Sequence, residues 1–300
     1  MTLLIFATRP SPLARQQTRL VINNLLNFWE DLSCQEVIIT TKGDRVIDKP
    51  LPEIGGKGLF TLELEQALLS KRVHAAVHSL KDLPTEEING LKIGVITQRA
   101  DVRDILFCPA GHTLDELPSN AVIGTSSVRR KAQLLAFRPD LQIKPIRGNV
   151  ETRIRKVREG HYDAIVLAAA GVLRLELPDV ITQYLPLNVL LPAPGQGALA
   201  VKCRASDVET LNYLNAIEHP ATRKAVTAER VFLDALGGGC SLPVGAYATV
   251  EGETISLNAE IVSPNGEKVL RFQGNHFDPY LLGAEVAQQA IIKGAKALLS

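Results

Sequence analysis

The chain has 300 residues, of which 46% are hydrophobic and 22% charged, a composition typical of a soluble globular protein with two or three domains. No stretch approaches the roughly 18 uninterrupted apolar residues of a membrane span. The first nine residues carry neither a basic leader nor a long apolar run, so they predict a strand rather than a signal peptide.

The formal net charge of +1 hides a local imbalance. Residues 121–160 hold ten Lys or Arg against three acids, a local net charge of +7, whereas residues 218–300 hold seven bases and nine acids. One region is therefore expected to bind anions and the other is not.

Short apolar segments alternate with amphipathic segments over the first two hundred residues, which predicts an α/β fold with largely parallel sheets. The predicted strands are, in chain order, Leu3–Ala7, Glu36–Thr40, Val73–His78, Leu91–Ile96, Ala121–Ile123, Gln142–Ile146 and Asp163–Ala168. The predicted helices are Pro12–Asn27, Leu59–Ser70, Ser127–Phe137 and Val150–Glu159. A glycine, a helix and an alanine before a strand recur at Gly58 and at Gly148 with nearly equal spacing, which indicates two similar lobes.

The alternation of apolar and amphipathic segments ends towards the C-terminus. Residues 191–197, rich in Pro and Gly, indicate a hinge or crossover. The later elements are predicted to be a helix at Thr222–Leu236, strands at Val244–Val250, Thr254–Val262 and Lys268–Gln273, and a helix at Tyr280–Leu299. Residues 263–266 form a hairpin turn between the last two strands. We expect a small α+β domain with a three-stranded antiparallel sheet.

The segment from Val77 to Pro84 places Lys81 and Asp82 at the end of a predicted buried strand. Ligands of α/β proteins bind at such strand ends, so this turn is a candidate site. An Asp before a Leu-Pro step is also a common turn or cap residue.

Hydroxyl groups and arginines follow several of the predicted strands. Thr125, Ser126 and Ser127 precede Arg129 and Arg130 where a strand meets a helix, which indicates either an anion site or a capped helix with solvated arginines. Further candidate anion contacts at such turns are Arg9, Ser11, Arg147, Gly148, Arg153 and Arg174. Guanidinium groups bind carboxylates in pairs. Aromatic residues make up only 5% of the chain and none lies among these arginines, which favours a small polyanion over nucleic acid.

Lys57 lies in a Gly-rich segment, Gly55–Phe60, that lacks the P-loop pattern and is expected to be a flexible flap. His74 and His78 share a strand face without the Glu of a zinc helix, so we expect no metal. The four cysteines form no metal or C-x-x-C spacing, which indicates a reduced, cytoplasmic protein. Cys240 follows three glycines and is either a small buried hydrophobe or an accessible attachment point.

Together these segments resemble the hydroxymethylbilane synthase (porphobilinogen deaminase) family over essentially the whole chain. The resemblance rests on ATRPSPLA at 7–14, GGKGLF at 55–60, AVHSLKDLP at 76–84, GTSSVRR at 124–130, RGNVETR at 147–153, LPAPGQGA at 191–198 and GGGCSLPVGAY at 237–247. It implies three domains: 1–97 with 192–217, then 98–191, then 218–300. The first two would resemble periplasmic-binding-protein lobes, and the third would carry the cofactor cysteine.

The resemblance implies a transferase of tetrapyrrole (porphyrin, haem) biosynthesis. Such an enzyme joins four porphobilinogen molecules head to tail, with loss of ammonia, on a covalent dipyrromethane cofactor, and hydrolysis releases linear hydroxymethylbilane. The cofactor would be a thioether of Cys240, and Asp82 the catalytic carboxylate. The implied cofactor and substrate contacts are Arg9, Ser11, Lys57, Ser79, Lys81, Thr125, Ser126, Ser127, Arg129, Arg130, Arg147, Gly148, Arg153, Ala168, Arg174 and Gln196.

Two other classes compete with this assignment. Two lobes with arginines also describe a non-catalytic binding protein for an organic anion, although the Cys240 loop and a third domain argue against it. A nucleic-acid-binding module is disfavoured by the near-neutral net charge. We expect a monomer that binds porphobilinogen and neither nucleic acid nor membrane.

Overall fold

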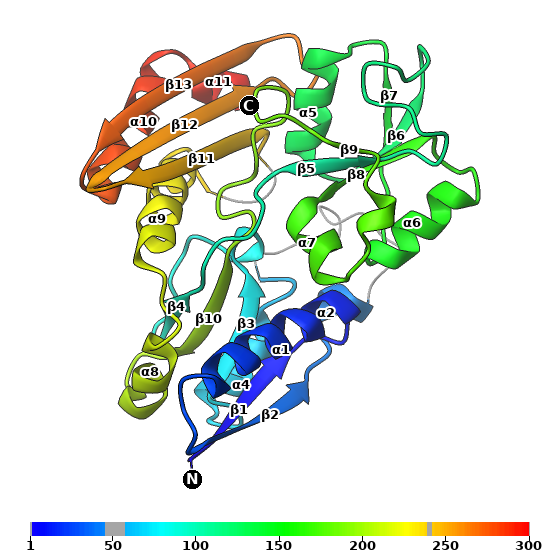
Figure 1. The fold of residues 1–300 in the computed structure, drawn as a ribbon. Coiled ribbons are helices and arrows are strands. Elements are labelled where there is room, and N and C mark those ends of the chain that lie inside the picture. The colour runs from blue at the N-terminus through cyan, green and yellow to red at the C-terminus, as the bar shows by residue number, and fades with distance from the viewer. Residues whose placement is uncertain (1, 46–57, 239–241, 300) are drawn as a thin grey trace. The chain divides into compact units, whose positions relative to one another are not determined.

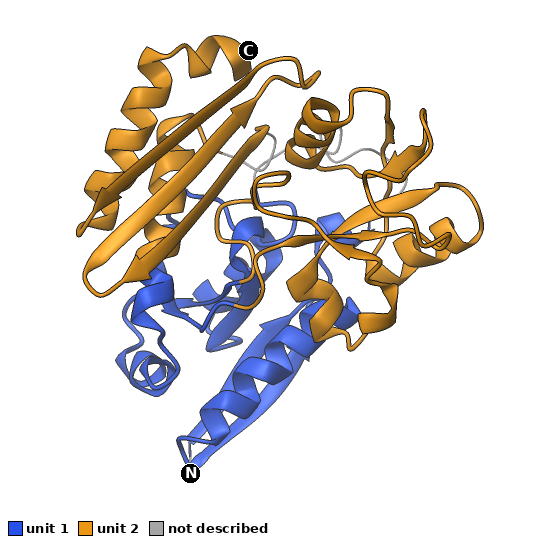
Figure 2. Cartoon of the chain, turned by 45° about the horizontal axis from the view of Figure 1, so that its top comes forward, with its two compact units in different colours: residues 1–99, 198–223 blue, residues 100–197, 224–300 orange. Residues whose placement is uncertain are grey.

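The computed structural model describes residues 2–45, 58–238 and 242–299. The chain divides into two compact units (Figure 2). Unit 1 comprises residues 1–99 and 198–223, and unit 2 comprises residues 100–197 and 224–300. Among the described residues, no helix is both long and apolar enough to cross a membrane.

Unit 1 is built on a five-stranded mixed sheet (Figure 1). Its strands are β1 (Thr2–Thr8), β2 (Leu32–Ile38), β3 (Ala75–Ser79), β4 (Leu91–Ile96) and β10 (Leu199–Arg204), in the spatial order β2-β1-β3-β10-β4. β1 pairs in parallel with β2 and β3, while β10 is antiparallel to both β3 and β4. All strands except β10 therefore run in one direction.

Helices cover both faces of this sheet. On one face, α1 (Pro12–Leu26) packs Val21 and Leu25 against Leu4 and Phe6 of β1. On the other, α4 (Leu62–Leu69) packs against Ala7 and Ala76. Neighbouring strand residues face opposite ways, which is why Ala76 belongs to a different core from its neighbours. The described part of unit 1 also contains the helices α2 (Lys42–Arg45) and α8 (Val208–Asn215).

Unit 2 contains a second five-stranded sheet with the same arrangement. Its strands are β5 (Asp104–Phe107), β6 (Val122–Gly124), β7 (Gln142–Lys144), β8 (Ala164–Ala168) and β9 (Gln183–Tyr184), in the order β7-β6-β8-β5-β9. β6 is parallel to β7 and β8, and β5 is antiparallel to β8 and β9. β5 thus occupies the position that β10 occupies in unit 1. This equivalence confirms the two similar lobes predicted from the internal repeat.

The helices of this lobe are α5 (Val128–Phe137), α6 (Val150–Arg158) and α7 (Ala169–Arg174), followed by the 3₁₀ turn η2 (Pro178–Val180). Side chains cap two of them. Ser127 Oγ accepts from the Arg130 N–H at 3.4 Å, and Asn149 Oδ1 accepts from the Thr152 N–H at 2.8 Å. These caps satisfy backbone donors that a helix start leaves open.

The C-terminal part contains α9 (Pro220–Ala235), β11 (Val244–Glu251), β12 (Thr254–Val262), β13 (Val269–His276), α10 (Pro279–Ile292) and α11 (Ala295–Leu299). The three strands form an antiparallel sheet in sequence order, as predicted. The single final helix predicted at Tyr280–Leu299 is wrong. Gly294 has a φ of +88°, a left-handed conformation that ends α10 before α11 begins.

Other boundaries also differ from the prediction. β2 begins at Leu32 rather than Glu36, because Leu32 is buried and pairs with Thr2 of β1. The strands β5, β9 and β10 and the helices α2, α7 and α8 were not predicted. The proposed three-domain division remains a prediction, since residues of the second and third predicted domains fall together in unit 2.

Candidate active site

The Lys81–Asp82 turn of unit 1 follows the central strand β3. The turn is a single 3₁₀ turn, η1 (Leu80–Asp82), anchored by buried Leu80 and Leu83. The Leu80 N–H donates to Ala198 O at 3.0 Å, and the Leu83 N–H donates to Leu80 O at 3.1 Å. Between these anchors, Lys81 is half-buried and Asp82 is exposed. The turn therefore presents the Asp82 carboxylate to solvent from a rigid base.

Arg9 follows β1, but its guanidinium contacts a carboxylate of the chain itself. Its Nη2 lies 2.5 Å from Asp44 Oδ1 and its Nε 3.2 Å from Asp44 Oδ2, and its Cζ lies 4.1 Å from the Phe60 ring centroid. Burial would raise the pKa of Asp44, but hydrogen bonds from Arg9 and Thr41 outweigh it and hold that pKa below its usual value. Asp44 already neutralises Arg9 in this structure.

The remaining predicted contacts of the N-terminal region differ in role. Ser11 caps α1 by accepting from the Ala14 N–H at 3.3 Å. Ser79, the last residue of β3, accepts a hydrogen bond from Gln17 Nε2 at 2.8 Å. Lys57 and Cys240 lie outside the described residues.

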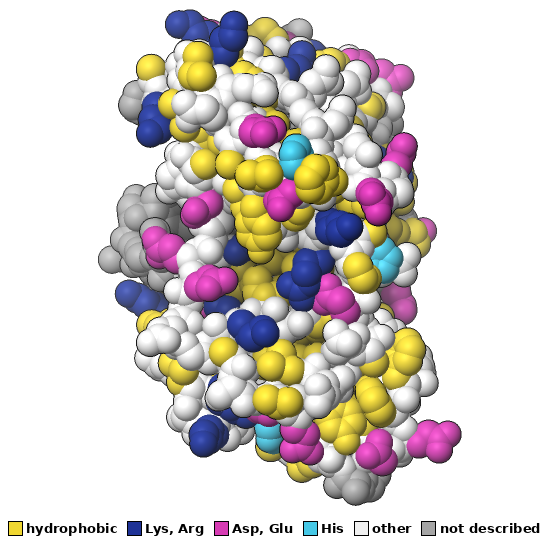
Figure 3. All heavy atoms as spheres, turned by 90° about the vertical axis from the view of Figure 1, so that its left-hand side faces the viewer, with side chains coloured by type: hydrophobic (Ala, Val, Ile, Leu, Met, Phe, Trp, Pro, Cys, Tyr) yellow, Lys and Arg dark blue, Asp and Glu magenta, His cyan; other side chains and the backbone are white. Residues whose placement is uncertain are grey.

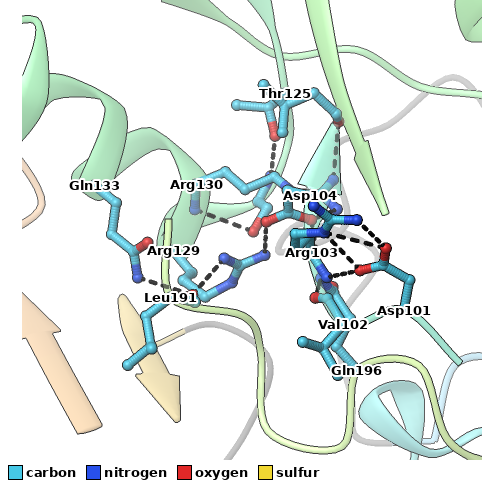
Figure 4. Close-up of polar contacts among 12 residues, drawn as sticks. Asp101, Val102, Arg103, Asp104, Thr125, Arg129, Arg130, Gln133, Leu191 and Gln196 are labelled. Carbon is cyan, nitrogen blue, oxygen red and sulfur yellow. Dashed lines mark hydrogen bonds and ion pairs between the residues drawn. The ribbon is translucent and has the colours of Figure 1, made fainter. Parts of the chain in front are cut away.

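Arg129 and Arg130, in the first turn of α5, converge on one buried carboxylate of unit 2 (Figure 4). Arg129 Nη2 lies 2.8 Å from Asp104 Oδ2, and Arg130 Nη2 lies 2.7 Å from Asp104 Oδ1. Asp104 is 0% exposed, and the arginines are 4% and 7% exposed. Their other terminal nitrogens donate to Leu191 O at 2.7 Å and to Val166 O at 3.0 Å. These arginines are interior groups of unit 2, not solvated surface residues.

Gln196 belongs to the same cluster. It is fully buried, and its Nε2 donates to Val102 O at 2.7 Å and to Asp104 Oδ1 at 3.0 Å. Leu191 O also accepts from Gln133 Nε2 at 3.2 Å. The Pro- and Gly-rich segment 191–197 is thereby tied to α5 and β5 (Figure 4).

The charges of this cluster do not balance. Two guanidinium groups contact one carboxylate, and the Nε–H of Arg129 and that of Arg130 are buried without a hydrogen-bond partner among the described residues. Burial and the charge of Arg130 lower the pKa of Arg129, against the opposing effects of Asp104 and, less strongly, Glu260. An unmet buried donor costs about 1–3 kcal/mol. An added anion would reduce both the charge excess and the loss of hydrogen bonding.

The hydroxyls before α5 help to build the turn. Ser126 Oγ donates to Ile146 O at 2.7 Å and accepts from the Ile146 N–H at 3.0 Å. The Ser127 N–H donates to Thr125 Oγ1 at 3.2 Å. Ser126 is exposed and Thr125 is buried.

The start of α6 holds three further predicted contacts. Gly148 has a φ of +112°, and a Cβ there would lie 2.6 Å from Thr152 Cγ2, so the position requires glycine. Arg153 Nε donates to Gly148 O at 2.9 Å, and Arg147 O accepts from Lys156 Nζ at 3.3 Å. Two basic side chains of α6 thus hold the turn that precedes this helix.

Arg174 lies at the end of α7, which Ala168 precedes at the end of β8. Its Nη2 donates to Gly197 O at 2.7 Å. Burial lowers the pKa of Arg174 to about 10. The carbonyl is a neutral partner, so Arg174 is a desolvated cation suited to binding an anion.

Sequence reasoning missed the residues that hold the arginines, above all Asp104 and Asp44. Asp104 opens a short apolar run, Ile105–Phe107, but Asp163 opens a similar run and is exposed, so the local sequence does not distinguish the buried acid. Among the described residues there is no group of three or more His, Cys, Asp and Glu that could hold a metal ion. Both basic and acidic side chains are exposed on the face drawn in Figure 3.

Comparisons with known proteins define the class. One family model, described as "Porphobilinogen deaminase, dipyromethane cofactor binding domain", matches residues 4–212, and another, "Porphobilinogen deaminase, C-terminal domain", matches residues 223–291. The fold and these matches define a cofactor-dependent enzyme built on two α/β lobes and a C-terminal antiparallel sheet.

The chain belongs to the porphobilinogen deaminase (hydroxymethylbilane synthase) family. It is 49% identical to the porphobilinogen deaminase of Brevibacillus brevis, over 98% of this chain and 95% of that protein. It is 48% identical to that of Shouchella clausii, over 100% of this chain and 97% of the relative. Family membership makes the chain an enzyme of tetrapyrrole biosynthesis with a dipyrromethane cofactor.

Solved structures of similar fold include a putative methionine-binding lipoprotein from Bacillus subtilis. It is 10% identical, with a TM-score of 0.43, over 73% of this chain and 92% of that chain. The effector-binding domain of BenM is 14% identical, with a TM-score of 0.42, over 72% of this chain and 91% of that chain.

Proposed function

We propose that Asp82 is the catalytic carboxylate of this chain and that its buried arginines hold the carboxylates of cofactor and substrate. The reaction joins four porphobilinogen molecules head to tail, releases ammonia at each addition, and frees hydroxymethylbilane by hydrolysis. The observation that carries the proposal is the Arg129–Arg130–Asp104 cluster, in which two buried cations share one carboxylate and two donors stay unmet.

The residues present fit a dipyrromethane cofactor. Its acetate and propionate groups are carboxylates, and the excess charge and unmet Nε–H donors of Arg129 and Arg130 suit such a group. When bound, the cofactor supplies the pyrrole carbon to which the first substrate molecule is joined. Cys240 would hold it by a thioether. The polar and main-chain contacts that we assign to cofactor and substrate are Arg9, Ser11, Lys57, Ser79, Lys81, Thr125, Ser126, Ser127, Arg129, Arg130, Arg147, Gly148, Arg153, Ala168, Arg174 and Gln196.

The role of Asp82 follows from the charge that develops in the substrate. As ammonia leaves porphobilinogen, positive charge builds up and is shared with the pyrrole nitrogen. A carboxylate beside that N–H stabilises the charge electrostatically, and the same group can take and return the proton. Lys81, next to Asp82, would bind a substrate carboxylate.

The Arg9–Asp44 ion pair limits the role that Arg9 can have as a ligand contact. For Arg9 to bind a ligand carboxylate, that carboxylate must share or replace Asp44. Arg174 meets no such competition from its neutral Gly197 carbonyl partner. We therefore expect Arg174 to contribute more than Arg9 to ligand binding in the state described here.

We further propose that the protein is a cytoplasmic monomer that binds no nucleic acid. The low aromatic content and the near-neutral net charge support the last point. Size-exclusion chromatography with light scattering tests the monomer. Salt-dependent binding of DNA at physiological ionic strength would contradict the absence of a nucleic-acid partner.

The proposal is tested by the intact mass of the purified protein beside its Cys240→Ala variant. We expect the wild type, as isolated or after incubation with porphobilinogen, to exceed its calculated mass by two pyrrole units, and the variant to show no excess. If wild-type protein never gains this mass, the chain is instead an organic-anion-binding protein. A mass gain that persists in Cys240→Ala would move the attachment point to another residue.

A further inference from the structure

We propose that Asp104 is a positioning residue that determines which edge of the Arg129 and Arg130 guanidinium groups is left for a ligand carboxylate. This inference rests on the proposed function of the two arginines. Asp104 itself is 0% exposed, so its effect on a ligand is transmitted through the arginines.

Each guanidinium is held at two of its three nitrogens. Arg129 contacts Asp104 through Nη2 at 2.8 Å and Leu191 O through Nη1 at 2.7 Å. Arg130 contacts Asp104 through Nη2 at 2.7 Å and Val166 O through Nη1 at 3.0 Å. A planar group held at two corners cannot rotate without losing a charge-assisted hydrogen bond. The orientation of each remaining Nε–H edge is therefore set by Asp104 together with one carbonyl.

The position of the arginines explains why a carboxylate is needed. Arg129 and Arg130 are adjacent and lie in the first turn of α5, where the helix dipole disfavours cations. Both are nearly buried, so their mutual repulsion is weakly screened. Asp104 places one oxygen against each guanidinium and offsets this repulsion. A neutral side chain could accept a hydrogen bond but would leave two buried charges uncompensated.

A single carboxylate also leaves the cluster able to attract an anion. The three hydrogen-bonded groups, two cations and one anion, carry a net charge of +1. Glu260 also acts on Arg129, but its own charge is offset by an ion pair with Arg271. Asp104 therefore orders both arginines while preserving part of their charge. Gln196 fixes the carboxylate in turn, because its Nε2 bridges Asp104 Oδ1 and Val102 O (Figure 4).

A matched control lies three residues away in the same unit. Asp101 pairs with Arg103 at 2.6 Å, but the two side chains are 23% and 42% exposed. This is a surface ion pair, which contributes little to stability. Asp101→Asn removes the same chemical group as Asp104→Asn without reaching the buried cluster.

The first readout is cofactor loading. Apo protein is incubated with porphobilinogen, and the rate of the two-pyrrole mass gain is followed by intact mass. We expect Asp104→Asn to load about tenfold more slowly or worse, since displacing a binding group by about 1 Å can cost up to about a hundredfold in rate. Asp104→Glu, which keeps the charge, should recover part of the rate, and Asp101→Asn should match the wild type. An Asp104→Asn protein that is folded and loads at the wild-type rate overturns the proposal.

A second pair of variants covers the case in which Asp104→Asn does not fold. The double variant Asp104→Asn/Arg130→Gln has the same net cluster charge as the wild type. It is compared with Arg130→Gln alone. If Asp104 acts through the arginines, Asp104→Asn/Arg130→Gln should load less than tenfold more slowly than Arg130→Gln alone, because one of the two arginines that Asp104 positions is already absent. If the double variant loads at least tenfold more slowly than Arg130→Gln, Asp104 acts independently of Arg130, which contradicts the positioning role.

A third readout is independent of the cofactor. Citrate, a small polycarboxylate, should raise the thermal midpoint of apo wild-type and Asp101→Asn protein, and should raise that of Asp104→Asn by less than half as much. An equal or larger shift in Asp104→Asn overturns the inference, because Asp104 would then only neutralise charge. If citrate acts in the expected way while wild-type protein never loads, the proposed function fails and the role of Asp104 stands.

Discussion

Gln17 donates a hydrogen bond from Nε2 to Ser79 Oγ across 2.8 Å, and so ties α1 to the last residue of β3. Asp82 follows three residues later, on a turn whose other anchors are backbone hydrogen bonds and buried leucines. A side chain that is itself 4% exposed thus supports the base of the candidate catalytic turn.

We predict that Gln17→Leu lowers the free energy of unfolding by about 1 kcal/mol, the usual net value of one hydrogen bond. Urea denaturation measures this change. The neighbouring Gln16 makes no side-chain hydrogen bond among the described residues, and Gln16→Leu should change stability by less than about 0.5 kcal/mol. Equal decreases in the free energy of unfolding of both variants would show that the Gln17–Ser79 hydrogen bond does not contribute specifically to stability.

We predict that Asp82→Asn lowers the rate of porphobilinogen consumption by about a hundredfold or more, since an amide cannot offset the developing positive charge. Asp82→Glu should retain weak activity, because it keeps the charge but displaces it. Since Asp82 is exposed, neither change should lower the thermal midpoint appreciably. Glu87→Gln, a change at an exposed acid beyond the turn, is the control. Comparable turnover in Asp82→Asn would remove Asp82 from the chemistry.

Lys202 and Glu65 form an ion pair inside unit 1, with Nζ and Oε1 2.7 Å apart and side chains 8% and 4% exposed. Lys202→Met leaves the buried carboxylate of Glu65 without its partner, so this change should destabilise the protein by about 3–5 kcal/mol. The double variant Lys202→Met/Glu65→Leu should regain most of that loss.

Chemical denaturation of the four proteins in this cycle measures the coupling between Lys202 and Glu65. The exposed Arg155–Glu159 pair, with atoms 3.7 Å apart, supplies the contrast. Arg155→Gln should cost less than about 0.5 kcal/mol. A double variant as unstable as Lys202→Met would refute the ion-pair explanation.

His78 should make stability depend on pH. Burial, helped by the nearby charges of Lys202 and Arg9, lowers the pKa of His78 from 6.5 to about 3. Between these values the unfolded chain binds a proton that the folded protein does not, so stability is full above about pH 6.5 and falls as the pH drops towards 3. The slope from one such group is at most about 1.4 kcal/mol per pH unit.

We predict that His78→Leu flattens the fall in unfolding free energy between pH 6 and pH 4, as measured by denaturation at several pH values. His161, whose side chain is 63% exposed, gives the control His161→Gln, which should keep the wild-type slope. An unchanged slope in His78→Leu would mean that other groups cause the acid sensitivity.

Local patterns in the sequence were sufficient for much of the fold. The alternation of apolar and amphipathic segments predicted the α/β lobes, and the turn at residues 263–266 predicted the hairpin between β12 and β13. Ser127 caps α5, which is one of the two alternatives that the sequence left open for this segment. These features depend on residues a few positions apart, so they can be recognised without knowing the rest of the structure. The ordered motifs also carried the family resemblance that the comparisons confirm.

The tertiary structure decided which groups meet. β5 and β10 are short apolar strands whose antiparallel direction depends on neighbours brought in from distant parts of the chain. The carboxylates that contact the predicted anion-binding arginines, Asp44 at Arg9 and Asp104 at Arg129 and Arg130, are each at least 25 positions away in sequence. A guanidinium has the same intrinsic chemistry whether it meets a ligand or an internal acid. Burial and the packing of distant strands determine which partner it has, and the amino-acid sequence specifies these only through the complete fold.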